Sequence, residues 1–456
     1  MAATQQDLLK IKIKGVAKRL YDTVDVPFYQ SLLRPRPKGV PGAPPTGVGS
    51  GAGDRQPGDP NSLGVGIYWP TPEPMLNAAI KVLKEVKTQK TKLFPPGRKW
   101  TPMGQEVDRN HYLELIVEKL REENQIDVDP MTEILCTNGI SQGMFLIPMM
   151  LIDPGDEVLV MDPDYMRLRT AKFWGARMVS VPLKERKRVL DETRWYFDSA
   201  ELESRITEKS KLFSFCNPNN PTGYVYSQDD LHAIARIAIK HDLFVLCNEC
   251  YERMDFRDEF EHTLVFNSLA AIPGMQERTF TLQGCTKAYE TEGNMTIGWL
   301  IGSSEHVSVL KWLQFVTCQK TGTAVGDYMG IAALTSPCRE DYVRHQLKIY
   351  RHNRDLLWEM FNRFSWLECG KPKGGCFVFP DVRAAGVSDE ELAKFLRERG
   401  IGAGSGTAWA ENPAYGEGHM RFSYCSPTEY QKVMTTDLEE AFKEYEVIHS
   451  DRIIKN

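Results

Sequence analysis

The sequence predicts an α/β fold, with a mostly parallel sheet flanked by helices and a smaller α+β domain packed on it. Between residues 75 and 335, short apolar segments typical of buried strands alternate with helical patterns. Polar motifs follow several of these segments, at the strand ends where parallel sheets bind ligands. After about residue 335, a long helical pattern leads into strand-like segments and further helices.

The expected elements follow from apolar periodicity and from the turn residues at their ends. Helical spacing of apolar residues covers residues 75–86, 111–123, 229–240, 341–364 and 389–399. Strands are expected at residues 134–136, 157–161, 211–216, 243–247, 279–282, 374–380 and 420–424. Two further helices are expected to open near Met144 and near Ser426, where serine can cap and the following proline suits the first helical position.

Composition excludes several classes of protein. The 456 residues suffice for two domains, and 42% hydrophobic with 26% charged residues is ordinary for a globular chain. A net charge of -5 provides no basic field for nucleic acid. No apolar run reaches the roughly 20 residues of a membrane span, and the first residues lack the pattern of a signal peptide. We therefore expect a cytoplasmic protein that binds neither nucleic acid nor membranes.

Ten cysteines are scattered along the chain, and reduced thiols are expected rather than a disulfide framework. Cys247 and Cys250 have CxxC spacing, which also occurs in redox and zinc sites. Coincidence at a strand end is the favoured interpretation, because no second CxxC completes a tetrahedral site. No metal site is predicted.

The chain divides into three expected parts. Proline and glycine are dense between residues 34 and 62, which excludes a helix or a central strand there. We expect an extended or mobile arm within the N-terminal part, residues 1–62. The large domain is expected over residues 93–335, and residues 63–92 and 336–456 together are expected to form the smaller domain.

The most informative motif is the segment Asn217–Gly223, with the sequence NPNNPTG. Its two Asn-Pro pairs and final glycine favour a tight, rigid turn after the expected strand 211–216. Such a turn holds an asparagine within reach of a ligand at the strand end. The motif resembles the NPxNPTG signature of fold-type I aminotransferases, which bind pyridoxal phosphate. The resemblance extends roughly over residues 60–445 and implies the fold of that family.

A second motif, the segment Thr137–Gln142, follows a strand and opens a helix. Its glycine allows close backbone approach, and amides at a helix N-terminus bind phosphate. It is similar to the phosphate-binding turn of the family, with Gly139, Ile140 and Ser141 at the contacting positions.

The resemblance also implies roles around the cofactor ring. Tyr165 would stack on the ring, Asn220 and Tyr251 would hydrogen-bond its phenolic oxygen, and Asn248 would lie at its nitrogen. These positions match the aromatic, asparagine and D-E-x-Y elements of the family.

Lys287, in the segment Gln283–Ala288, resembles the lysine that forms the Schiff base with the cofactor. Together with Tyr251 it would be catalytic, because a released lysine amine can move a proton at the substrate's Cα. Thr286, directly before it, is a further cofactor-binding candidate.

Substrate contacts are implied by two more segments. Arg421 resembles the family's C-terminal arginine, whose planar fork binds an α-carboxylate through two parallel hydrogen bonds, with Asn220 beside it. Gly66, Ile67 and Tyr68 belong to a segment that lines the substrate site in the family. Tyr68 and the following tryptophan replace its usual polar end, so an aromatic pocket face is expected.

Three positions depart from the family pattern. Asn248 replaces an aspartate, and an asparagine supplies no charge to keep the ring nitrogen protonated. Gly284 replaces a serine, and Leu300, or Met295 if counted from the lysine, replaces an arginine. In the family both residues hold the phosphate, and the arginine contact alone is worth roughly 1.5–3 kcal/mol. We expect other residues to replace these phosphate contacts. Thr286, Asn294 and Thr296 are near in sequence, and Arg98 and Lys99 are candidates from a partner subunit.

The resemblance implies a homodimeric pyridoxal phosphate enzyme that acts on a free amino acid, with aminotransferase chemistry as the family default. An alternative is β- or γ-elimination, replacement or cyclisation of an amino acid, which Asn248 and the aromatic Tyr68 favour. A non-catalytic binding protein of the same fold is a third interpretation. It is less favoured because the lysine, tyrosine, asparagine and arginine of the site are all retained.

Overall fold

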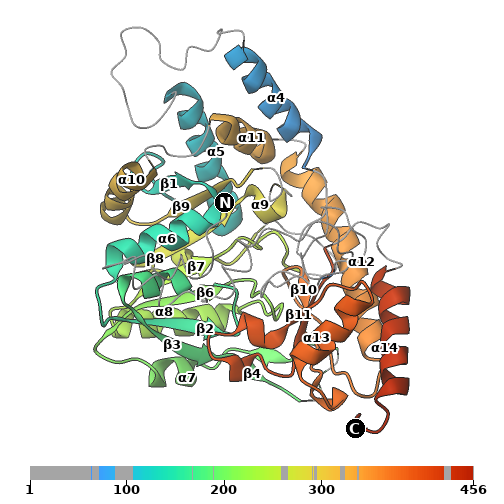
Figure 1. The fold of residues 1–456 in the computed structure, drawn as a ribbon. Coiled ribbons are helices and arrows are strands. Elements are labelled where there is room, and N and C mark those ends of the chain that lie inside the picture. The colour runs from blue at the N-terminus through green and yellow to red at the C-terminus, as the bar shows by residue number, and fades with distance from the viewer. Residues whose placement is uncertain are drawn as a thin grey trace, which may run out of the picture.

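The computed structural model describes residues 63, 71–87, 106–166, 168–187, 189, 191–257, 265–289, 291, 295–318, 324–335, 338–425 and 433–454. Within these ranges the chain forms a seven-stranded sheet, a three-stranded sheet and a two-stranded hairpin, surrounded by helices (Figure 1).

The seven-stranded sheet has the strand order β1-β9-β8-β7-β6-β2-β3. Its strands are β1 Ile134–Thr137, β2 Glu157–Asp162, β3 Arg177–Pro182, β6 Ser210–Cys216, β7 Phe244–Asn248, β8 Thr279–Gly284 and β9 Gly298–Ile301. Strands β3, β2, β6, β7 and β8 pair in parallel, whereas β9 is antiparallel to both β8 and β1. The predicted mostly parallel sheet is confirmed.

Helices cover both faces of this sheet, because alternate side chains of each strand point to opposite faces. In β2, Val158 and Val160 join the hydrophobic cluster that includes side chains of α5 and α6, whereas Leu159 and Met161 join a second cluster with α7 and α8. The helices of this part are α5 Glu106–Asn124, α6 Gly139–Leu151, α7 Ser199–Ser204, α8 Gln228–Lys240, α9 Cys285–Ala288, α10 Ser304–Cys318 and α11 Ala324–Leu334.

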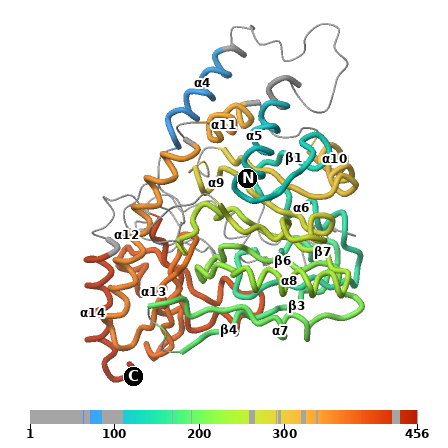
Figure 2. The backbone as a smooth tube through the Cα atoms, turned by 180° about the vertical axis from the view of Figure 1, so that it is seen from behind, coloured from blue at the N-terminus to red at the C-terminus, as the bar shows by residue number. Residues whose placement is uncertain are grey.

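The C-terminal part contains a small antiparallel sheet with the order β10-β12-β11. Its strands are β10 Phe377–Val378, β11 Gly404–Ser405 and β12 Met420–Ser423, and its helices are α12 Val343–Phe361, α13 Asp389–Glu398 and α14 Leu438–Ile448. These three helices stand together on one side of the molecule in both views (Figure 2). The hairpin of β4 Lys184–Glu185 and β5 Trp195–Tyr196 lies beside them.

Shorter elements complete the described chain. The 3-10 helices are η1 Arg169–Trp174, η2 Leu269–Ala271, η4 Arg383–Ala385, η5 Gly406–Trp409 and η6 Pro413–Tyr415, and the π-helices are η3 Cys338–Tyr342 and η8 Val433–Asp437. Near the N-terminus, α4 Glu73–Lys87 packs along α11. Leu63 is bonded into the C-terminal part: its N–H donates to Gly402 O at 3.0 Å, and its carbonyl accepts from Ser423 N at 2.6 Å.

Most expected elements are present, with differences at their ends. The helix expected from Met144 begins at Gly139, because this glycine adopts a φ of 68° and turns the chain directly from β1 into α6. The strand expected at 374–380 is shortened to β10, since Gly375 has a φ of 77°. The division into domains stays a prediction, and most of the N-terminal arm lies outside the described residues. Among the described helices, none combines the length and apolar character that a membrane crossing requires.

Candidate active site

Five strands of the large sheet end at one edge and bring the predicted motifs there. Because β9 is antiparallel to both β1 and β8, these two strands run in the same direction as β7, β6 and β2. The segments that follow the five strand ends are residues 138–141, 163–165, 217–223, 249–251 and 285–287. In open sheets of this kind, ligands bind outside the carboxyl ends of the strands.

The turn 217–223 is held in place by the side chain of Asn219. Its Oδ1 accepts hydrogen bonds from the backbone N–H of Thr222 at 3.2 Å and from its hydroxyl at 2.6 Å. Its Nδ2 donates to Asp164 Oδ2 at 2.9 Å. The turn is therefore tied to the segment after β2 as well as to itself, and Asn220 is fixed at the sheet edge.

Three residues from distant motifs form one buried hydrogen-bonded chain. Arg421 Nη1 donates to Asn220 Oδ1 at 3.1 Å, and Asn220 Nδ2 donates to the hydroxyl oxygen of Tyr251 at 3.2 Å. All three side chains are buried. Burial raises the pKa of Tyr251 well above its ordinary value, so this hydroxyl keeps its proton. Since it accepts from Asn220, its own proton points elsewhere.

Two aromatic residues that sequence reasoning missed enclose Arg421. The guanidinium carbon lies 3.4 Å from the ring centroid of Trp409 and 3.9 Å from that of Phe377. Both rings are buried. No sequence signal could have found this arrangement, because a cation and a ring in contact have no fixed spacing along the chain.

Tyr165 lies next to this group and is partly exposed to solvent. Its backbone N–H donates to Asn220 O at 2.7 Å, and its ring centroid lies 6.0 Å from that of Trp409. Tyr165 is 48% exposed. A flat ligand could pack on the exposed ring.

Asp164 is the most strongly perturbed acid at the strand edge. Its carboxylate accepts from the backbone N–H groups of Met166 at 2.6 Å and Cys216 at 2.9 Å, besides Asn219. Complete burial nevertheless raises its pKa to about 7, with the nearby charge of Asp162 acting in the same direction. The proton occupancy of Asp164 therefore changes near neutral pH.

Asn248, at the end of β7, presents an unsatisfied donor. Its Oδ1 accepts from Cys250 N at 3.0 Å, and because a backbone N–H can only donate, this contact fixes which end of the amide is oxygen. The opposite atom, Nδ2, is buried and has no hydrogen-bond partner among the described residues. The buried hydroxyl of Thr286 has none there either. Both donors lie at or directly after strands that end at this edge, where a bound ligand could supply their acceptors.

Three glycines bring the phosphate-type turn, β9 and the lysine segment into backbone contact. A Cβ at Gly284 would lie 2.3 Å from Ile297 O, and a Cβ at Gly298 would lie 2.8 Å from the carbonyl carbon of Gly139. At Gly284, where the family pattern has a serine, β9 leaves no room for a side chain. Lys287 follows in α9 and is half-buried.

Leu300, one of the two positions where the family's arginine is expected, is part of the core beneath α6. It is fully buried, and a Cβ at Gly143 of α6 would lie 3.4 Å from its Cδ1. A pocket of about 320 Å³ opens beside the turn, and Thr137, Asn138 and Asp327 are among its lining residues. The hydroxyl of Thr137 is buried without a partner in the described chain.

A buried ionic network supports the ends of β7 and β8 from below. Gln283 Nε2 donates to Glu249 Oε2 at 2.9 Å and to Glu252 Oε2 at 3.0 Å, and Lys119 Nζ donates to Gln283 Oε1 at 2.9 Å. Burial raises the pKa of Glu249 to about 7, with the charge of Glu252 acting in the same direction. The network fixes the spacing between the tyrosine segment and the lysine segment.

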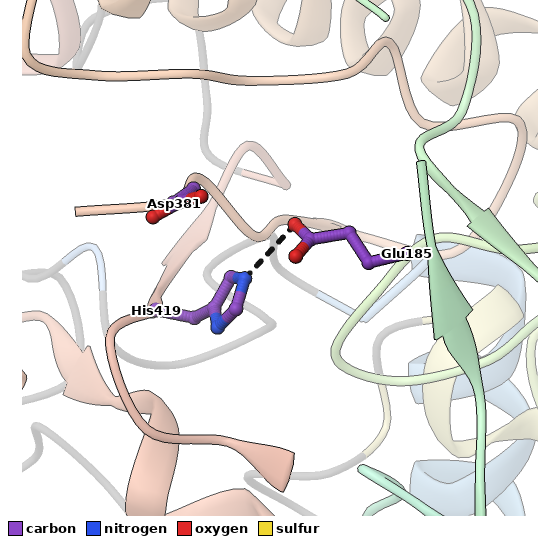
Figure 3. Close-up of side chains that lie close together, drawn as sticks. All are labelled: Glu185, Asp381 and His419. Carbon is purple, nitrogen blue, oxygen red and sulfur yellow. Dashed lines mark hydrogen bonds and ion pairs between the residues drawn. The ribbon is translucent and has the colours of Figure 1, made fainter. Parts of the chain in front are cut away.

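A second ionic cluster lies between the hairpin and the small sheet (Figure 3). His419 Nε2 lies 3.1 Å from Glu185 Oε1, and Asp381 lies beside them. Arg194 contacts both carboxylates, at 2.9 Å and 3.2 Å, and Arg383 pairs with both as well. Burial acts to raise the pKa of Asp381, but hydrogen bonds from Arg383 outweigh it and lower the pKa to about 2. The arginines neutralise these acids, so the cluster joins two sheets rather than offering ligands to a metal.

Several predicted positions lie outside the described residues. These are Gly66, Ile67 and Tyr68 of the expected substrate segment, and Arg98, Lys99 and Asn294 among the expected phosphate contacts. Cys247 and Cys250 are buried thiols, not joined in a disulfide.

The sheet order and the motifs gathered at its carboxyl edge define a fold-type I transferase. The family model described as aminotransferase class I and II matches residues 75–436, and the chain belongs to this family.

Individual relatives agree with this assignment. The aspartate aminotransferase of Musicola paradisiaca is 29% identical over 385 residues, covering 82% of this chain and 87% of the relative. The aspartate/prephenate aminotransferase of Thermus thermophilus is 31% identical, covering 79% and 84%. The crystal structure of an aromatic aminotransferase from Pyrococcus horikoshii superposes with a TM-score of 0.73 at 27% identity, covering 85% and 96%. The chain is thus an enzyme of the aminotransferase type.

Proposed function

We propose that this chain transfers the amino group of an α-amino acid to a keto acid, with pyridoxal phosphate held by Lys287. The observation that carries the proposal is the buried chain of Arg421, Asn220 and Tyr251, assembled at the strand edge where Lys287 also lies. The relatives named for aspartate, prephenate and aromatic substrates support an amino acid as the substrate here.

The residues at the edge fit pyridoxal phosphate. The buried donors Asn248 Nδ2 and Thr286 Oγ1 have no partners in the described chain, and a ring nitrogen and a phosphate would supply acceptors. The first backbone amides of α6, in Gly139, Ile140 and Ser141, would bind the phosphate. When bound, pyridoxal phosphate withdraws electrons from the Cα of the amino acid.

The protein side chains then have distinct roles. Lys287 would hold the cofactor and carry the proton at the substrate's Cα. Tyr251 would donate its proton to the cofactor's phenolic oxygen, since its own oxygen already accepts from Asn220. Tyr165, which is partly exposed, would cover the ring.

Arg421 would bind the substrate's α-carboxylate, with Asn220 linking that contact to Tyr251. Gly66, Ile67 and Tyr68 stay a prediction for the opposite wall of the substrate site.

A second candidate function is elimination or replacement at the β or γ carbon of an amino acid. The observation that favours it is Asn248, which offers an N–H donor rather than a negative charge. A ring nitrogen without a proton withdraws electrons less strongly, and transamination depends on that withdrawal.

The test is an absorption spectrum of the purified protein with added pyridoxal phosphate, beside Lys287→Ala and the surface control Lys240→Ala. We expect a visible band in the wild type and the control that Lys287→Ala lacks. Addition of amino acids should then release keto acid and leave pyridoxamine phosphate. Pyruvate or ammonia without pyridoxamine phosphate would favour the second candidate, and no lysine-dependent band would refute both.

We also propose a homodimer in the cytoplasm. On α4, Leu76, Ile80 and Leu83 are exposed and follow one another at helical spacing, which supports a surface covered by a second copy. Light scattering should give twice the chain mass, and Leu83→Glu should lower it. A monomeric wild type would refute the dimer, and cell fractionation tests the location.

A further inference from the structure

The guanidinium of Arg421 is enclosed on both faces. Trp409 lies on one side at 3.4 Å and Phe377 on the other at 3.9 Å, measured from the guanidinium carbon to the ring centroids. Trp409 is 2% exposed and Phe377 3%. Such a sandwich holds a planar cation in one plane, because a rotation that tilts the guanidinium out of this plane would drive it into a ring.

This enclosure restricts how an anion can reach the arginine. Neither face is accessible, and Nη1 already donates to Asn220 Oδ1 at 3.1 Å. An acid bound by the guanidinium must therefore approach within its plane. A carboxylate satisfies this condition, since its two oxygens match two parallel N–H groups in one plane. A tetrahedral phosphonate can also place two oxygens in that plane, but its third oxygen then lies out of the plane, on a side that one of the rings covers.

Trp409 follows β11 of the small sheet but is also bonded to the large sheet. Trp409 ends the 3-10 helix η5, and its carbonyl oxygen accepts from Asp164 N at 3.1 Å. Two of the next three residues also bond to the end of β2: the N–H groups of Glu411 and Asn412 donate to the Asp162 carboxylate at 3.0 and 2.8 Å. Arg421, in contrast, belongs to β12, and Phe377 belongs to β10. The sandwich therefore joins the two sheets.

Trp409 also reaches the other ring of the site. Its centroid lies 6.0 Å from that of Tyr165, with an angle of 31° between the planes. One indole therefore contacts both the arginine and the partly exposed tyrosine at the strand edge.

We propose that Trp409 is a positioning residue of the substrate site, which fixes the plane of Arg421 and so selects a planar carboxylate over tetrahedral anions. The inference rests on the proposed role of Arg421 as the carboxylate-binding residue. In this role Trp409 does not touch the substrate's carboxylate. It influences which class of anion binds by holding Arg421 in place.

The experiment uses the full chain with pyridoxal phosphate and compares Trp409→Leu, Trp409→Phe and Phe377→Leu. The matched control is Trp366→Leu, a buried tryptophan that packs on Phe442 and Tyr445 instead. The kcat and KM are measured with the amino acid that the wild type uses best. Binding of 3-phenylpropionate, succinate and 2-phenylethylphosphonate is measured by calorimetry.

We expect Trp409→Leu to raise KM about 30-fold with a smaller change in kcat, and Phe377→Leu to act in the same direction. Trp409→Phe should restore most of the KM, because a ring again covers the guanidinium. The preference for the better-bound carboxylate over the phosphonate should shrink in Trp409→Leu and persist in Trp366→Leu.

An unchanged KM and an unchanged preference in Trp409→Leu would overturn the inference, as would equal shifts in Trp366→Leu. If Trp409→Leu fails to fold, Phe377→Leu decides by the same two measurements. If the wild type transfers no amino group, the proposed function fails. In that case loss of carboxylate binding in Trp409→Leu would still support the positioning role, and unchanged binding would overturn it.

Discussion

On the side of the site near β12, polar side chains are hydrogen-bonded to one another and enclosed by aromatic rings. On the side near β1 and β9, backbone meets backbone at Gly139, Gly284 and Gly298, and Leu300 fills the space beneath. The first region keeps the residues of the family pattern, and the second has lost two of them. If the proposed roles hold, the difference means that side chains orient the substrate on the first side, whereas main-chain amides and close packing would serve the phosphate on the second.

The largest effect is expected at Asn220, and the comparison between the two sides would fail if catalysis did not need this residue. Asn220→Ala removes one partner each from Arg421 and Tyr251 inside a buried chain. We expect kcat/KM to fall about 100-fold, which corresponds to roughly 3 kcal/mol. Steady-state kinetics beside the surface control Asn267→Ala measures this. A loss below about fivefold would mean that the buried chain is not part of the catalytic site.

The close backbone packing near β1 and β9 is tested by a substitution that restores the family's serine at position 284. In Gly284→Ser, the new Cβ would lie 2.3 Å from Ile297 O, so β9 must move. We expect the free energy of unfolding in urea to fall by about 2 kcal/mol and the affinity for pyridoxal phosphate to fall with it. The control is Gly302→Ala, where the nearest atom is a Phe280 ring carbon at 3.2 Å. A stable Gly284→Ser protein with tighter cofactor binding would refute the packing explanation.

Asn248, the residue proposed to lie at the ring nitrogen, lies between the two sides of the site, so its substitution tests both sides together. Asn248→Asp replaces a neutral donor with a charge that keeps a proton on the ring nitrogen. We expect the ratio of keto acid formed to ammonia formed to rise roughly fivefold, because a charge-assisted bond is stronger by about 1 kcal/mol. Asn267→Asp, which adds the same charge elsewhere, should leave the ratio unchanged. A lower ratio in Asn248→Asp would contradict the assignment.

The smallest expected effect is a dependence of stability on pH. Asp164 has a pKa of about 7 in the folded chain against 3.8 for an unperturbed aspartate, so between these values the folded state binds more protons than the unfolded state. Stability must therefore fall as pH rises across this window. Asp164→Asn should flatten the pH profile of urea unfolding, although Glu249 leaves a slope of the same sign. An identical profile in both proteins would show that Asp164 does not titrate there.

Much of the large sheet could be predicted from sequence, because its strands are short apolar segments that end in distinctive turns. Strands β2 and β7 were expected within about one residue of their observed ends, and the turn 217–223 was identified from its prolines and glycine. The start of α6 was expected at Met144 and missed, because the left-handed conformation of Gly139 cannot be seen in apolar spacing.

The remaining features depend on contacts between distant segments. Trp409 and Phe377 were not predicted, since only the fold brings their rings to Arg421. The replacement at Gly284 was recognised from the motif, but the close approach of β9 at this position is contained in no local pattern. The orientation of the Asn248 amide likewise follows from the Cys250 N–H.

Leu63 bears on how the chain is assembled during synthesis. Its two backbone partners, Gly402 and Ser423, are made 339 and 360 residues after it. At typical rates of about 5–20 residues per second, a ribosome needs roughly 20–70 s to supply them. Within that interval the strands of the large sheet are all complete once Ile301 has been made, so they can pair before Gly402 and Ser423 are available. The early-made segment at Leu63 thus joins its partners last, so release of the nascent chain before Ser423 leaves the small sheet without both its arginine strand and this attachment.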